Sequence, residues 1–145
     1  MNMSSVIHPH RKTALPTAGG ILTIIASCVS IYLGWGELSA GINPGTGPNF
    51  LGLPPPSVLL WMGVFAILAF TFGLAGGITS LRRKMLGISN AGNVLLIASS
   101  FVTVLGYGLF SQYCLLFFGL IFALPIFILS ILGSIFVNVS KREFS

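Results

Sequence analysis

Residues 57–110 read SVLLWMGVFAILAFTFGLAGGITSLRRKMLGISNAGNVLLIASSFVTVLGYGLF, two long apolar runs separated by the basic cluster Arg82-Arg83-Lys84. Each run exceeds the roughly 20 residues that a helix needs to cross a hydrocarbon core about 30 Å thick. Only residues 82–86 join the two runs, so we expect a tight antiparallel pair of helices. The stretch therefore predicts a helical hairpin that crosses a membrane twice.

Two further apolar stretches flank this hairpin and predict two more crossings. We expect helices over residues 14–34, 57–81, 87–110 and 113–139, a polar tail over 1–13, a Gly- and Pro-rich loop over 35–56 and a basic tail over 140–145. Helices satisfy all their backbone polar groups within one segment, which lipid requires. The expected fold class is all-α, an integral membrane up-down bundle of four transmembrane helices in one domain spanning 14–139.

The composition supports a membrane protein. The chain is 54% hydrophobic and 6% charged, whereas soluble domains carry about 25% charged residues. In a soluble protein the net charge of +5 would suggest a nucleic-acid partner. Here the basic residues lie in short segments beside the expected helices, where membrane topology and anionic lipid headgroups explain them better. We expect the bilayer as partner and no nucleic acid.

The basic residues also predict the orientation of the chain. Cytoplasmic segments of membrane proteins carry an excess of Lys and Arg, so the two tails and the second loop are expected in the cytoplasm, and the protein in the cell membrane. Aromatic residues that favour the headgroup zone lie near the opposite ends of the helices. The topology determinants are Arg11, Lys12, Arg82, Arg83, Lys84, Lys141 and Arg142, and the aromatic residues are Tyr32, Trp35, Trp61, Tyr107 and Tyr113.

Small residues recur at helical spacing along the expected helices. Such stripes let backbones approach closely, which favours helix association in lipid. They fit either packing within one chain or a homo-oligomer, and four helices in one chain favour the first. The helix-packing candidates are Gly20, Thr23, Ser27, Ser30, Gly73, Gly77, Ser99, Thr103 and Gly106.

Some polar residues fall near the expected cytoplasmic ends or within the helices. Asn90, Asn93 and Asn138 are expected to form interhelical hydrogen bonds, with headgroup binding as the alternative. Cys28 and Cys114 are isolated in sequence, and we expect them to act as buried, small apolar side chains rather than as a disulfide.

The residues for several kinds of chemistry are missing from the expected helices. No ionisable residue falls inside them, and Glu37 follows the first one, which disfavours proton-coupled transport. Haem ligation needs His within the bundle, but His8 and His10 lie in the first tail. No nucleophile, base and acid stand together. We therefore predict no catalytic residue, no cofactor and no metal site, and a protein that is not an enzyme.

Three segments carry a resemblance to known proteins: TAGGILTII (Thr17–Ile25), GGITSLRRK (Gly76–Lys84) and IFVNVSKREF (Ile135–Phe144). In this order they resemble small four-helix membrane proteins of unknown function in archaea and bacteria. The resemblance implies the four-helix architecture and brings no catalytic or binding residues with it.

Two classes of function fit these expectations. The first is a non-catalytic multi-pass membrane protein that acts by association, as an accessory subunit, an assembly factor or a membrane organiser. The alternative is a passive oligomeric pore or a lipid-handling protein.

Overall fold

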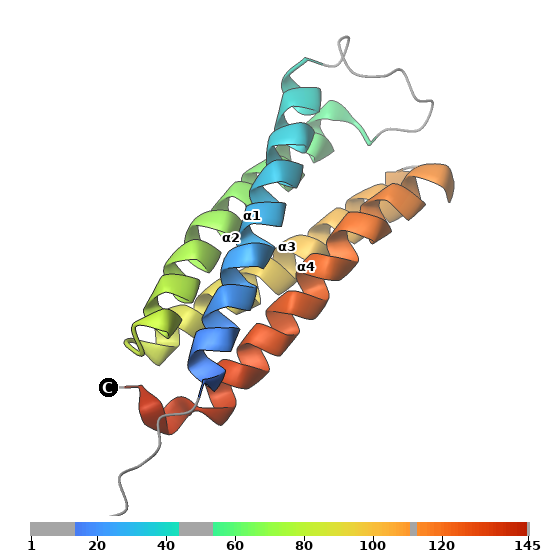
Figure 1. Ribbon diagram of the computed structural model, residues 1–145. Coiled ribbons are helices and arrows are strands. Elements are labelled where there is room, and N and C mark those ends of the chain that lie inside the picture. The colour runs from blue at the N-terminus through green and yellow to red at the C-terminus, as the bar shows by residue number, and fades with distance from the viewer. Residues whose placement is uncertain (1–13, 44–53, 111–112, 145) are drawn as a thin grey trace, which may run out of the picture.

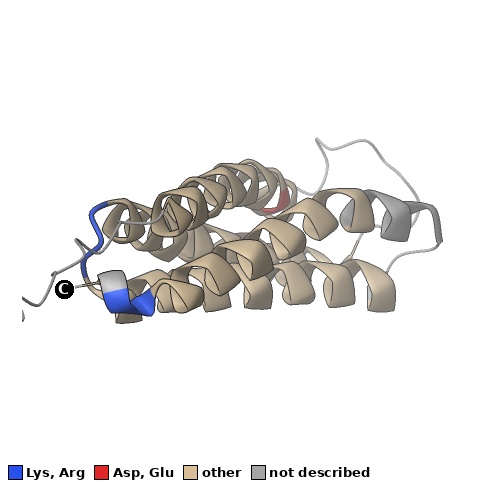
Figure 2. Cartoon of the chain, turned by 60° about the horizontal axis from the view of Figure 1, so that its bottom comes forward, with Lys and Arg blue, Asp and Glu red and all other residues tan. Residues whose placement is uncertain are grey.

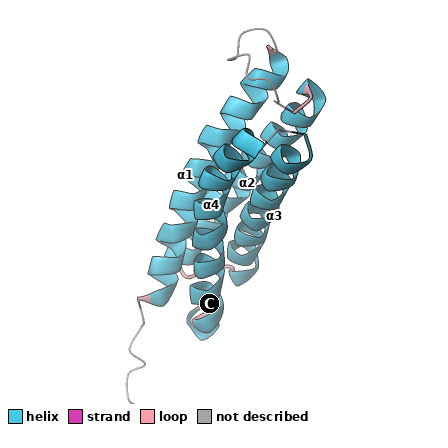
Figure 3. Cartoon of the chain, turned by 90° about the vertical axis from the view of Figure 1, so that its right-hand side faces the viewer, coloured by secondary structure: helices cyan, strands magenta, loops and turns pink. Residues whose placement is uncertain are grey.

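The computed structural model describes residues 14–43, 54–110 and 113–144, with side chains for 14–43, 54–109, 120–142 and 144. These residues form four long helices, α1 (Leu15–Ile42), α2 (Pro56–Leu81), α3 (Leu86–Phe110) and α4 (Tyr113–Val139), followed by the short 3-10 helix η1 (Lys141–Glu143). The described part of the chain contains no strand (Figure 3). All four helices include segments long and apolar enough to cross a membrane. The all-α class and the four candidate spans are confirmed.

The four helices form a ring in which each contacts two neighbours. α1 packs on α2 and α4, and α3 packs on α2 and α4, with little contact across the α1–α3 diagonal. α1 begins and α4 ends at the same end of the bundle (Figure 1). The helices are close together at this end, and the α1–α2 pair diverges from the α3–α4 pair toward the other end (Figure 1).

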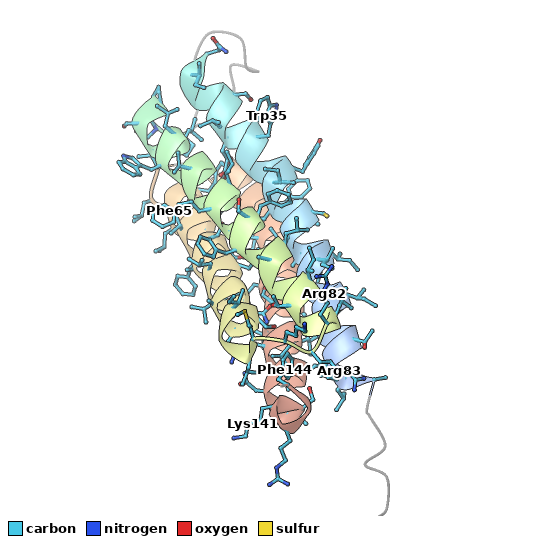
Figure 4. The ribbon with its side chains drawn as sticks, turned by 90° about the vertical axis from the view of Figure 1, so that its left-hand side faces the viewer. Trp35, Phe65, Arg82, Arg83, Lys141 and Phe144 are labelled. Carbon is cyan, nitrogen blue, oxygen red and sulfur yellow. The ribbon has the colours of Figure 1, made fainter. Side chains whose placement is uncertain are left out.

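The two ends of the bundle differ in composition. Arg82, Arg83, Lys84, Lys141 and Arg142 lie at the end where α2 and α4 finish, which we call the basic end (Figure 2). The exposed side chains of Tyr32, Trp35 and Trp61 lie toward the opposite end, which we call the aromatic end. Figure 4 shows Trp35 far from Arg82, Arg83 and Lys141.

The turn between α2 and α3 is closed by backbone hydrogen bonds. The Lys84 amide donates to the Thr79 carbonyl over 2.9 Å, and the Arg83 amide donates to the Ser80 carbonyl over 3.0 Å. This pair of bonds is the Schellman arrangement that ends many helices. Arg83 occupies its left-handed position with φ 53°, where Gly is usual. The basic cluster is thus built into the turn itself.

The first helix is longer than the sequence predicts. It was expected to end at Gly34, where Trp35, Gly36 and Glu37 suggested the start of a loop. Instead α1 continues to Ile42, because the added turns pack closely on α2: a Cβ on Gly63 would meet the Leu38 amide nitrogen at 2.8 Å. The same turns place Glu37 on the buried face of α1. The expectation that no ionisable residue lies inside a helix was therefore wrong for Glu37. The other bounds agree within one residue.

Candidate functional site

One face of α1 is buried along its whole length. Its buried positions recur at alternating steps of three and four residues, as one face of a helix requires. The seven residues of this stripe are Gly20, Thr23, Ser27, Ser30, Gly34, Glu37 and Gly41. Glu37 is thus the charged member of a stripe that otherwise holds only Gly, Ser and Thr.

The Glu37 side chain is buried without a hydrogen bond. It is 4% exposed, and among the described residues neither of its carboxylate oxygens has a hydrogen-bond partner. A buried charge without a partner is costly. Glu37 is therefore the residue of this bundle that most clearly lacks a matching group.

Glu37 lines a pocket of about 350 Å³ at the aromatic end. The pocket lies between α1 and the α3–α4 pair. Its walls come from three helices, and most of its surface is apolar or aromatic. The residues that line it are Tyr32, Leu33, Trp35, Gly36 and Glu37 of α1, Thr103 and Tyr107 of α3, and Phe122 of α4.

Two other residues with hydroxyl groups line the same pocket as Glu37. Thr103 is buried and Tyr107 is half-buried. A mostly apolar wall with a few converging polar groups is typical of small-molecule sites. The pocket can hold an apolar body with a polar head beside Glu37.

The depth of Glu37 matches the headgroup zone of a bilayer. α1 has 28 residues, which at about 1.5 Å per residue span about 42 Å. A bilayer with its headgroups is about 40–45 Å thick. Glu37 is five residues before the last residue of α1, about 8 Å from the end of the helix. If α1 crosses a bilayer, the carboxylate lies near the boundary between acyl chains and headgroups.

A second pocket of about 210 Å³ lies between α3 and α4, nearer the middle of the helices. Its walls are apolar except for Ser100, and they include Phe101, Leu105 and Phe127. The Ser100 hydroxyl donates to the Leu96 carbonyl of its own helix over 2.9 Å. This pocket therefore offers no unpaired polar group to a ligand.

The nine helix-packing candidates all lie in the interior of the bundle. Thr23, Ser27, Ser30, Ser99 and Thr103 are buried, and so are Gly20, Gly73, Gly77 and Gly106. Neighbours within the same chain occupy the space above these glycines. A Cβ on Gly20 would meet the Gly77 carbonyl at 2.8 Å, and one on Gly106 would meet the side chain of Met62. Thr103 is the one candidate that also lines the Glu37 pocket.

The expected bonds between asparagines and neighbouring helices are present. Asn90 of α3 donates from its amide nitrogen to the Asn138 amide oxygen of α4 over 3.1 Å. The Thr23 hydroxyl lies 2.8 Å from the Asn93 amide oxygen and so links α1 to α3.

The cysteines and the topology determinants differ in their exposure, and some of them lie outside the described residues. Cys28 was expected to be buried but is exposed, because it follows the buried Ser27 and faces outward. The side chain of Cys114 lies outside the described residues, as do Arg11, Lys12, His8 and His10. The other determinants lie at the basic end, with Arg82, Lys84, Lys141 and Arg142 exposed and Arg83 half-buried.

The sequence reasoning missed the site because it ended the first helix too early. The spacing of small residues already indicated a longer helix. Continuing the alternating steps of three and four residues from Ser30 and Gly34 reaches Glu37 and Gly41. Within the described residues, no group of three or more His, Cys, Asp or Glu side chains is placed to hold a metal ion.

Comparisons with protein families, curated proteins and solved structures find no match for this chain. The resemblance to small four-helix membrane proteins stays a prediction.

Proposed function

We propose that this chain is a non-catalytic membrane protein that binds an amphiphilic molecule in the Glu37 pocket, and so handles lipid. It crosses the cell membrane four times with both termini in the cytoplasm. The excess of Lys and Arg at the basic end supports this orientation, and anionic headgroups of the cytoplasmic leaflet are its partners there. The observation that carries the proposal is the aromatic pocket with a buried carboxylate that has no hydrogen-bond partner among the described residues.

The size of the pocket favours a single amphiphile over a partner subunit. Its volume of about 350 Å³ lies in the range of about 300–1,000 Å³ that is typical of small-molecule sites. A partner subunit would instead need a broad outer surface, since a stable protein interface buries about 800 Å² on each partner. The pocket is thus better suited to one molecule than to a docked chain, which places lipid handling ahead of association as an accessory subunit.

The packing of the small residues argues against a pore built on them. An oligomer of that kind needs glycine faces open to a second copy. In this chain Gly20 faces Gly77, Gly34 faces Ala66, and Gly73 faces Ser27 and Leu96. These faces serve contacts between helices of one chain.

Filling the pocket tests the proposal. Gly36 lines it, and a Cβ added there meets no atom within 4 Å, so Gly36→Leu places a bulky side chain in open space. Gly87 is also helical and open but lies next to the basic cluster, which makes Gly87→Leu the matched control. The full chain is extracted in a mild non-ionic detergent, and native mass spectrometry records bound lipid.

We expect a retained lipid-sized mass in the wild type and in Gly87→Leu, and its loss in Gly36→Leu. Equal retention in all three proteins would overturn the pocket as the site. If crosslinking in native membranes instead captures one stable partner through Trp35 or Tyr32, the association function replaces this proposal.

A further inference from the structure

We propose that the head of the bound amphiphile is an ammonium group, held by the Glu37 carboxylate at the aromatic end. This inference rests on the proposed function, because it names the chemical class of the molecule that the pocket takes. The ligand is a membrane lipid or a related amphiphile with a positively charged amine head, and its apolar chain lies along the aromatic wall.

The first argument is the charge that Glu37 leaves unmatched. An ionised carboxylate removed from water needs a cation or several hydrogen-bond donors near it. The described part of the chain supplies neither, since both carboxylate oxygens lack a hydrogen-bond partner there. The described Lys and Arg residues lie at the basic end, at the opposite end of the bundle from Glu37 (Figure 2). A cation from outside the chain completes the site.

The second argument is the kind of surface around the carboxylate. Tyr32, Trp35 and Tyr107 line the same pocket as Glu37. The faces of aromatic rings attract cations, and cages of aromatic rings recognise ammonium ligands. An anionic head would instead be repelled by Glu37 and would gain nothing from the ring faces. Charge complementarity therefore selects an ammonium over a phosphate or a sulfate.

The third argument is depth. The carboxylate lies about 8 Å below the end of α1, close to where the headgroups of a bilayer meet the acyl chains. An amphiphile in its ordinary orientation brings its head to this level without leaving the membrane. The pocket is lined by residues of α1, α3 and α4, so the alkyl chain lies among apolar side chains such as Leu33 and Phe122.

Tryptophan fluorescence provides the test. The chain has two tryptophans, and Trp61 does not line the pocket, so Trp61→Phe leaves Trp35 as a reporter inside it. The full-length Trp61→Phe protein in non-ionic detergent is titrated with dodecylammonium and, separately, with dodecanol. The two probes share one alkyl chain and differ in the charge of the head. The titrations are repeated with Glu37→Gln, Gly36→Leu and Gly87→Leu added to this background.

We expect dodecylammonium to shift Trp35 emission at a concentration at least about tenfold lower than dodecanol, because a hydrogen bond to a charged group is worth about one decade of affinity. Glu37→Gln keeps the shape of the side chain, so it should bring the two probes within about twofold of each other. A dodecanol response that survives in Glu37→Gln shows that the pocket is still folded. The two probes partition differently into micelles, so each concentration is expressed as the mole fraction of probe in the micelle before the probes and the variants are compared.

The outcomes separate this inference from the proposed function. If Trp35 responds equally to both probes, or if the preference survives Glu37→Gln, the ammonium head is wrong. In that case, loss of both responses in Gly36→Leu but not in Gly87→Leu would show that the pocket still binds an amphiphile. The head of that amphiphile would then be uncharged. If Gly36→Leu and Gly87→Leu respond alike, the pocket is not the site, and both proposals fail.

Discussion

At the scale of single residues, the contact between Thr23 and Asn93 shows how a polar pair is accommodated inside an apolar bundle. The Thr23 hydroxyl oxygen lies 2.8 Å from the Gly19 carbonyl and 2.8 Å from the Asn93 amide oxygen. A hydroxyl has one hydrogen and donates once, and among the described residues the Asn93 amide nitrogen has no partner. Turning the amide over resolves this contact: Asn93 then donates to Thr23, and Thr23 donates to Gly19.

Removing the Thr23 hydroxyl should therefore destabilise the bundle through Asn93. Thr23→Val keeps the shape of the side chain, and we expect it to lower the free energy of unfolding by about 1–2 kcal/mol, because it leaves a buried amide without its partner. In an Asn93→Ala background the same substitution should cost less. The difference between the two costs is the coupling energy of the pair, expected to be about 0.6–1.7 kcal/mol. The measurement is unfolding in mixed micelles by circular dichroism.

Thr71→Val is the matched control for this cycle. The exposed Thr71 hydroxyl donates only to the Ile67 carbonyl of its own helix, over 2.9 Å, so its loss should change stability by less than about 0.5 kcal/mol. An equal cost of Thr23→Val with and without Asn93 would show that the two side chains are not coupled.

At the scale of the helices, α1 and α2 are held at a distance that only glycine permits. A Cβ on Gly20 would meet the Gly77 carbonyl oxygen at 2.8 Å and the Leu81 amide nitrogen at 3.2 Å. Both atoms belong to the backbone of α2, so no rotation of a side chain relieves the contact. Close approach also increases the van der Waals contact that holds helices together in lipid.

Substitution of two glycines in the same helix separates packing from helix propensity. Gly20→Ala should lower the free energy of unfolding by about 1–3 kcal/mol, because α1 and α2 must move apart. Gly36→Ala faces open space and should leave stability unchanged or raise it by up to about 1 kcal/mol, since Ala favours the helix. Unfolding midpoints of both variants in one detergent give the comparison. Equal destabilisation by the two would rule out a special role for the Gly20–Gly77 contact.

Hydrophobic runs and small-residue spacing predict most of this fold, because lipid leaves few alternatives to long helices. The bounds of α2, α3 and α4 follow from where charged residues, prolines and the polar pair Ser111-Gln112 interrupt the runs. The end of α1 does not follow, since a glycine and a glutamate resemble a loop when the neighbouring helices are unknown. Whether Glu37 faces water or a pocket depends on how far α3 and α4 diverge from α1, and the spacing of apolar residues does not encode that angle. The pocket therefore could not be predicted from the sequence, although the stripe of small residues that reaches Glu37 could.

At the scale of the whole molecule, the described Lys and Arg residues gather at one end of the bundle. The described Lys and Arg residues lie at the basic end, and Glu37 lies toward the aromatic end (Figure 2). A chain with this distribution inserts preferentially with its basic loops in the cytoplasm. The ammonium site at Glu37 would then be presented to the outer leaflet, and the basic cluster to anionic headgroups of the inner one.

Cysteine labelling in intact cells tests this orientation. In a Cys28→Ala/Cys114→Ala background, Ser57→Cys places a thiol at the start of α2 near the aromatic end, and Gly87→Cys places one at the start of α3 near the basic end; both positions are exposed. We expect a membrane-impermeant thiol reagent to label Ser57→Cys in intact cells and Gly87→Cys only after the membrane is permeabilised. The background without added cysteine should stay unlabelled. The reverse pattern would place Glu37 at the cytoplasmic leaflet, so that its amphiphile would have to be drawn from the inner face of the membrane.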